Sequence, residues 1–163
     1  MGDPVGPERR TRDGRVVVAA ADRTITVGPE SDGSLPETDD QIEIVCASGN
    51  RYEATWTGIP VSSLLEAVGA PADTTHLTIA SADGYRIAVP LTDGLDGMIA
   101  YRRDGRPIGD GRPYRNRFVA PAVEGARDVK GVVRVEFHSL GPTDDPDALE
   151  VVEPMDDRFA ADR

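Results

Sequence analysis

Residues 45–65 read VCASGNRYEATWTGIPVSSLL, and the order of elements around this stretch decides the fold class. Just before it, the run QIEIVC (41–46) alternates polar and apolar residues, which predicts a strand that ends on Cys46 and opens into a loop. At the other end, Pro60 stands at the start of VSSLLEAV (61–68) and Gly69 follows it. These are the start and stop signals of a helix. The stretch therefore joins a strand to a helix.

Outside this stretch, short β-branched runs alternate with turn residues. A hairpin is predicted over 15–27 and a loop over 28–40, and a second hairpin over 98–108 turns at Asp104-Gly105. Further strands are predicted at 77–80, 85–91, 117–121 and 131–137. One helix among so many strands predicts an α+β fold that is mainly β.

The 163 residues suit one domain of ordinary size. We expect that domain to span 15–141, between a flexible leader (1–14) and an acidic C-terminal tail (142–163). Arg9-Arg10 and the apolar run that follows resemble an export signal, but that run covers only residues 16–21, too few for such a signal. We therefore expect a cytoplasmic protein.

Composition excludes several classes of protein. Eighteen basic and twenty-nine acidic residues give a net charge of −11, which argues against nucleic-acid binding. No apolar run approaches the roughly 20 residues that a membrane span needs. One cysteine excludes an internal disulfide framework and a cysteine-rich zinc site. Nineteen Asp and a single lysine, Lys130, indicate the acidic surface of a halophilic protein, whose self-repulsion salt screens.

Three side chains of the opening stretch could form a reactive site. A lone cysteine is most often a small buried hydrophobic residue, and Cys46 could be that. However, Gly49-Asn50 can turn the chain back over the sulfur, and Arg51 could hold it as a thiolate. Trp56 adjoins Thr57-Gly58, which we predict to be a turn with the ring partly exposed. Together they could make an anion pocket around a soft metal ligand.

The order of these and later motifs resembles the molybdopterin-binding domain of the sulfite oxidase family. The blocks that carry the resemblance span about residues 41–137 and are, in order, Cys46, Gly49-Asn50-Arg51, Trp56-Thr57-Gly58-Ile59-Pro60, Leu64-Leu65, Gly69, Ser81-Ala82-Asp83-Gly84-Tyr85, Val89-Pro90-Leu91, Ala100-Tyr101, Asp104-Gly105-Arg106-Pro107-Ile108, Gly111-Arg112-Pro113, Arg117-Phe118-Val119-Ala120-Pro121, Gly125-Ala126-Arg127-Asp128-Val129-Lys130 and Arg134-Val135. The resemblance implies a fold of mixed sheets with a few short helices.

The resemblance implies roles for the metal and substrate side. Cys46 falls where the family's cysteine binds molybdenum, beside the dithiolene sulfurs of the pterin. Arg51 would face the substrate oxyanion, Trp56 would form the pocket wall, and Tyr85 would donate a hydrogen bond near the reacting oxygen. From the residues alone, Arg51 could equally be a solvated surface charge and Tyr85 a packing aromatic.

For the pterin side, Lys130 matches the basic segment near the cofactor's phosphate. The family's arginine is Arg117 when counted back from Pro121, but Arg115 when counted forward from Pro113, so both stay candidates. His76 and His138 match nothing diagnostic, and we expect both at the surface.

Taken together, the resemblance implies a molybdenum-cofactor-dependent oxidoreductase without haem. It would move an oxygen atom to or from a small oxyanion or S-oxide and pass electrons to an external carrier. A partner subunit could complete the enclosure of the cofactor. The alternative is a cofactor-free binding module descended from this family.

Overall fold

The computed structural model describes residues 14–29, 35–45, 48–123 and 129–152, and these form two five-stranded sheets with short helices. The first sheet has the order β2-β1-β10-β5-β6, with β1 and β10 parallel and the other neighbours antiparallel. Its strands are β1 (Val16–Ala20), β2 (Arg23–Val27), β5 (His76–Ser81), β6 (Arg86–Pro90) and β10 (Val132–His138).

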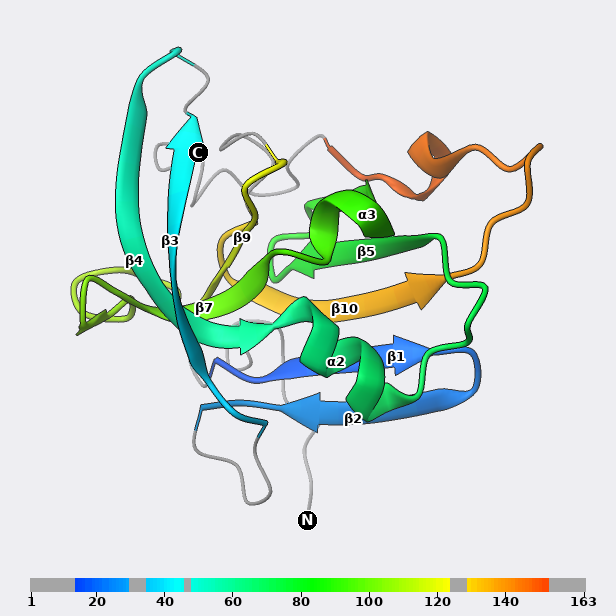
Figure 1. Cartoon of the computed structure of the whole chain (residues 1–163), viewed down its shortest axis with the longest axis horizontal. Helices are drawn as coiled ribbons and strands as arrows, with labels where there is room; N and C mark the ends of the chain where they lie inside the picture. Colours follow the sequence, from blue (N-terminus) through cyan, green and yellow to red (C-terminus); the bar gives the residue numbers. More distant parts are fainter. Residues whose placement is uncertain (1–13, 30–34, 46–47, 124–128, 153–163) are drawn as a thin grey trace.

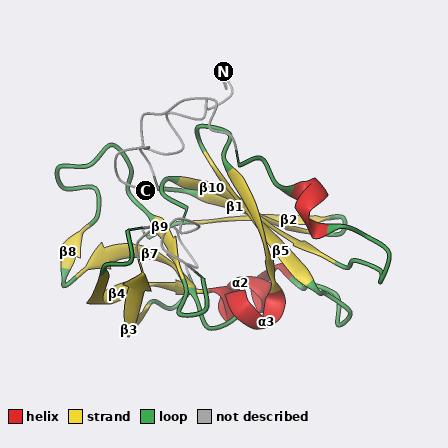
Figure 2. Ribbon diagram, turned by 90° about the horizontal axis from the view of Figure 1, so that it is seen from above, coloured by secondary structure: helices red, strands yellow, loops and turns green. Residues whose placement is uncertain are grey.

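The second sheet is antiparallel, with the order β3-β4-β7-β8 and with β9 also paired to β7. Its strands are β3 (Thr38–Val45), β4 (Arg51–Pro60), β7 (Met98–Arg103), β8 (Arg106–Pro107) and β9 (Arg117–Val119). Figure 1 shows β3 and β4 as a long pair that rises away from the first sheet. Figure 2 shows the two sheets on either side of the molecule.

The described residues also form three short helices, namely α2 (Val61–Val68), α3 (Leu91–Gly94) and the 3-10 helix η2 (Pro146–Leu149). Helix α2 begins after Pro60 and ends at Gly69, whose φ of 67° is the left-handed conformation that glycine adopts readily. It buries Val61, Leu64 and Val68 and lies against β1 and β2 (Figure 1). The predicted helix is thus confirmed.

Strand alternation separates two hydrophobic cores. Along β7, Ile99 packs into the core between the two sheets, whereas Met98 and Ala100 pack into a second core on the far face of the second sheet. Trp56 and Tyr114 belong to this second core, which also holds Ile42 and Ile44 from β3. The second sheet therefore has a buried aromatic floor on the face turned away from the first sheet.

The structure corrects several sequence predictions. The segment 51–60, for which no strand was predicted, is the longest strand of the described chain, and Thr57-Gly58 forms an irregularity in it instead of a turn. The predicted partial exposure of Trp56 is wrong, since its exposed fraction is 1%. The strand predicted over 85–91 stops at Pro90, because α3 begins at Leu91.

The first part of the expected acidic tail pairs with the edge strand β6. Val151 and Arg86 exchange two backbone hydrogen bonds of 2.8 Å, and the Arg86 side chain donates to the carbonyl of Leu149. The Glu150 carboxylate accepts a hydrogen bond from the backbone N–H of Ala88. This segment satisfies backbone groups that an open sheet edge would expose. The expected leader lies outside the described residues, apart from Gly14.

No helix in the described part of the chain is both long and apolar enough to cross a membrane.

Candidate functional site

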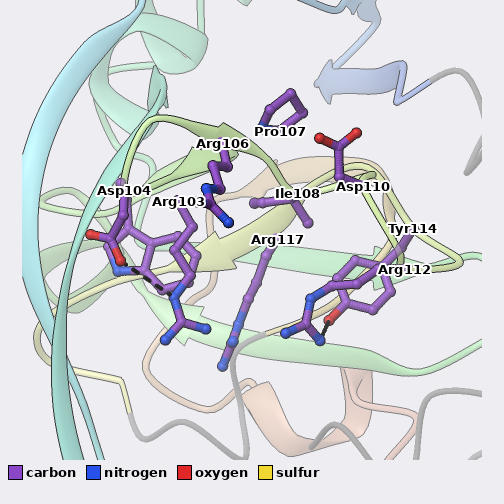
Figure 3. Close-up of a pocket in the computed structure, with 10 residues that line it drawn as sticks. Arg103, Asp104, Arg106, Pro107, Ile108, Asp110, Arg112, Tyr114 and Arg117 are labelled. Carbon is purple, nitrogen blue, oxygen red and sulfur yellow. Dashed lines mark hydrogen bonds and ion pairs between the residues drawn. The ribbon is translucent and has the colours of Figure 1, made fainter.

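A pocket of about 570 Å³ opens over the aromatic floor of the second sheet (Figure 3). Its walls come from the β7–β8 hairpin, from the segment that leads to β9, and from β4. The residues that line it are Trp56, Arg103, Asp104, Arg106, Pro107, Ile108, Asp110, Arg112, Tyr114 and Arg117. Four guanidinium groups face two carboxylates, so the pocket carries a net positive charge in a protein whose net charge is −11.

Side chains alternate between the two faces of β4, and this alternation decides which of them lie on the face of the second sheet that carries the pocket. Tyr52, Ala54 and Trp56 belong to the second core and leave the strand on one face, two residues apart. Arg51 lies at an odd spacing from them, so its side chain leaves the opposite face. There it forms an exposed ion pair of 3.0 Å with Glu43 of β3.

Two arginines lie against the aromatic floor. The Arg103 guanidinium lies over the Tyr52 ring, at 4.7 Å from its centroid, and 5.6 Å from the centroid of Trp56. The Arg117 guanidinium is 5.5 Å from the Trp56 centroid, and it donates a hydrogen bond of 3.2 Å to the Tyr52 hydroxyl. Rings hold such cations by their negative faces and leave the edges of the guanidinium for ligands.

Among the described residues that line the pocket, hydrogen-bond donors outnumber carboxylate acceptors. The indole N–H of Trp56 is buried and has no hydrogen-bond partner among the described residues. A buried donor without an acceptor costs about 1–3 kcal/mol. Arg112 donates to the Tyr114 hydroxyl at 3.3 Å, which keeps that guanidinium at the wall of the pocket. An arrangement of this kind suits an anion that offers several acceptor oxygens.

The structure separates the residues predicted for the substrate side. Trp56 lines the pocket, whereas Arg51 lies on the opposite face of β4. Tyr85 precedes β6 in the first sheet and packs into the core between the sheets. Its backbone N–H donates to the Asp83 carboxylate at 3.1 Å. Neither Arg51 nor Tyr85 is among the residues that line the pocket, and their predicted roles stay predictions.

The residues predicted for the pterin side fall on both sides of the β7–β8 hairpin. Arg117 is buried in the pocket wall and forms an isolated backbone bridge with Lys130, whose exposed fraction is 3%. Paired residues of a ladder share one face, so these two cations emerge together. Arg115 is exposed and lines a second pocket of about 360 Å³, with Arg102 and Glu37. Which of Arg115 and Arg117 is the family's arginine stays a prediction. Cys46 lies outside the described residues.

Sequence reasoning missed Tyr52, Arg103, Arg106 and Arg112. Tyr52 was missed because no strand was predicted over 51–60, so the face on which its side chain lies could not be assigned. A usable signal existed for the arginines, since six of the chain's seventeen lie between 102 and 117, where Asp104 and Asp110 are the only acidic residues. In the described ranges, no group of three or more His, Cys, Asp or Glu side chains is placed to hold a metal ion.

Comparisons with known proteins agree with this architecture. The family model described as "Oxidoreductase molybdopterin binding domain" matches residues 23–142. The mitochondrial sulfite oxidase of Drosophila melanogaster is 26% identical over 148 residues, covering 71% of this chain and 25% of that protein. The sulfane dehydrogenase SoxCD from Paracoccus pantotrophus superposes with a TM-score of 0.67 at 21% identity, covering 80% of this chain and 39% of the other. The chain thus spans well under half the length of both.

Proposed function

Because the chain belongs to the oxidoreductase molybdopterin-binding domain family, we propose that it binds a molybdenum cofactor of the molybdopterin type. As an enzyme it would move an oxygen atom to or from a small oxyanion or S-oxide. Cys46 would bind the metal through its thiolate, because a soft sulfur donor suits this metal. When bound, the cofactor supplies the redox couple and the exchangeable oxygen atom.

The observation that carries this proposal is the donor-rich pocket over Trp56. Its arginines and the buried indole N–H fit an anionic group, which both a pterin phosphate and an oxyanion substrate present. Arg117 and Lys130 would hold the phosphate, since both are buried and emerge from one face. Trp56 would form the wall on the substrate side, and Tyr114 would orient Arg112 there.

Electrons would pass to an external carrier, and a partner subunit would close the cofactor site. The pocket supports this second part of the proposal, because it opens at the surface between the β7–β8 hairpin and β4 (Figure 3). Catalysis at a charged centre gains from excluding water. A partner that covers this opening would exclude water from the cofactor.

The proposal is tested by metal and pterin analysis of protein purified from a molybdenum-replete host. We expect about one molybdenum and one pterin per chain, and loss of the metal in the Cys46→Ser variant. Ser62→Ala, an exposed change on α2, is the matched control and should keep the metal. Folded wild-type protein without molybdenum and without pterin fluorescence after oxidation would refute the proposal.

A second candidate function is a cofactor-free module that binds an anion. The position of two predicted substrate residues favours it: Arg51 points away from the pocket, and Tyr85 precedes β6 of the other sheet and packs into the core between the sheets. The same metal analysis separates the candidates, since the module would purify without molybdenum and still bind anions.

A further inference from the structure

We propose that His76 and His138 form a binding site for a divalent transition metal ion, and that Cu²⁺ and Ni²⁺ are the ions it holds best. The chain has only two histidines, and the fold pairs them directly, with His76 on β5 opposite His138 on β10 (Figure 1). Residues paired in a ladder share one face, with Cβ atoms about 4.5–5.5 Å apart. At this separation one metal ion can contact both imidazoles. The inference is independent of the molybdenum cofactor, because neither strand contributes a residue to the pocket over Trp56.

Both histidines lie on the outer face of the first sheet. Their chain neighbours Leu77 and Phe137 pack into the core between the sheets, so the histidine side chains leave the opposite face. The side chain of His138 is 21% exposed, and His76 is also half-buried. Ions in solution can therefore reach the pair, while the surrounding residues restrict both rings.

The local hydrogen bonds decide which nitrogen of His76 can bind a metal. Its Nδ1 lies 2.8 Å from the Thr75 hydroxyl. That hydroxyl donates its only proton to the carbonyl of His138, at 3.4 Å, and accepts from the backbone N–H of Leu140, at 2.9 Å. It can therefore only accept from His76, so Nδ1 of the neutral ring carries the proton and Nε2 keeps its lone pair. Histidines that bind metals commonly donate their other N–H to a neighbouring oxygen in this way.

His138 has a matching hydroxyl partner. Its Nε2 lies 2.9 Å from the hydroxyl of Thr78, which is buried. A proton on Nε2 is held by that hydroxyl and leaves the lone pair of Nδ1 for the metal. Burial also lowers the pKa of His138, and the neutral imidazole is the form that binds a metal ion.

Glu136 lies beside the pair but is not placed as a third ligand. Its Oε2 is 4.0 Å from Nε2 of His138, and its Oε1 is 3.7 Å from a guanidinium nitrogen of Arg134. Within the described ranges no three His, Cys, Asp or Glu side chains are grouped to hold a metal, so water would complete the coordination shell. Imidazole suits Ni²⁺, Cu²⁺ and Zn²⁺, and the affinity of such ligands peaks at Cu²⁺.

The test uses the full chain without a histidine tag, because its two histidines are then the only ones present. Calorimetric titration with nickel chloride at neutral pH, in a buffer that does not chelate metals, gives the Kd and the stoichiometry. We expect one Ni²⁺ per chain. His76→Gln and His138→Gln should each raise the Kd about tenfold or more, because each removes one of the two protein ligands. Glu53→Gln, an exposed change on β4, controls for binding to the acidic surface and should leave the Kd unchanged.

Two further measurements separate this site from other ligands of the chain. Cys46→Ser should keep the Ni²⁺ Kd, which would exclude the thiol as a ligand. Ni²⁺ should raise the unfolding midpoint of the wild type more than that of His138→Gln, because an ion that binds only the folded state stabilises it. Circular dichroism establishes that each variant is folded, and His76→Gln serves if His138→Gln is unstable.

Equal Kd values in the wild type and both histidine variants overturn the inference, and so does a loss of Ni²⁺ binding in Cys46→Ser alone. Protein that binds Ni²⁺ through its histidines but never acquires molybdenum refutes the proposed function and supports this site. Protein that acquires molybdenum but shows no saturable Ni²⁺ binding refutes this site alone.

Discussion

Arg51 and Trp56 leave opposite faces of strand β4, although they lie only five residues apart in the sequence. The arginine ends in solvent beside Glu43, and the indole ends under the guanidinium groups of Arg103 and Arg117. The residue that shares the pocket face with Trp56 is Tyr52, the neighbour of Arg51. One step along a strand therefore separates a surface charge from a side chain on the pocket face of the sheet.

The Arg51–Glu43 pair should contribute little to folding. The side chains are 70% and 49% exposed, so water and salt screen the 3.0 Å contact. Urea unfolding of Arg51→Gln, Glu43→Gln and the double variant should give a coupling energy of about 0.5 kcal/mol, and at most about 1 kcal/mol. A coupling energy well above about 1 kcal/mol would contradict this expectation.

Asn116 should be one of the most sensitive polar positions. Its side chain accepts from the backbone N–H of Val132 at 2.6 Å and donates to the carbonyls of Val132 and Gly14. It thus ties the entry of β1 and the start of β10 to β9. Asn116→Ala leaves buried backbone groups unpaired and should destabilise the protein by about 3 kcal/mol. The only other asparagine, Asn50, is exposed, and Asn50→Ala should change the unfolding midpoint little. Equal midpoints for the two variants would contradict this role.

Most of the order of strands and helices could be predicted from the sequence, but less of the candidate site could. The helix after Pro60 was predictable because a proline begins it and a glycine ends it. The hairpin was predictable because the dipeptide Asp104-Gly105 readily adopts positive φ values, which are 51° and 81° at this turn. Strand β4 was not, because its sequence, RYEATWTGIP, contains Gly and Pro and alternates only in part. The position of Arg103 opposite Trp56 depends on the irregularity in the β4–β7 pairing, which is a property of two strands distant in the sequence.

Gly58 should tolerate no side chain. A Cβ there would lie 2.0 Å from the carbonyl oxygen of Ile99 and 2.6 Å from the Cα of Ala100, both backbone atoms that cannot move aside cheaply. Gly58→Ala should therefore destabilise the protein by about 3 kcal/mol or prevent folding. Gly28→Ala is the matched control, since its Cβ would meet nothing closer than 3.4 Å. Thermal unfolding compares the two, and a stable Gly58→Ala variant would show that the β4–β7 pairing leaves room for a side chain at this position.

Tyr101 should make the fold sensitive to alkali. Its hydroxyl donates to the carbonyl of Gly14 at 2.7 Å, and burial raises the pKa of Tyr101 well above its usual value. The folded state then holds the proton more tightly than the unfolded state, so stability falls only as pH rises above about 10, the unfolded pKa. Tyr101→Phe should lower stability at pH 8 by about 1 kcal/mol and flatten the decline above pH 10. Urea midpoints from pH 8 to 11 measure this, and parallel declines in both proteins would exclude Tyr101 as the cause.

Salt should stabilise the fold, because the charge of −11 makes the surface repel itself at low ionic strength. The Debye length falls from about 30 Å at 0.01 M to about 3 Å at 1 M, so molar potassium chloride removes most of this repulsion. It also weakens exposed ion pairs such as Arg51–Glu43, but each contributes only about 0–1 kcal/mol. The excess of acidic groups should therefore decide the sign, and the unfolding temperature should rise with potassium chloride. Sucrose of equal osmolality controls for solvent exclusion. A flat or falling unfolding temperature in salt would mean that the acidic composition is not an adaptation to a saline interior.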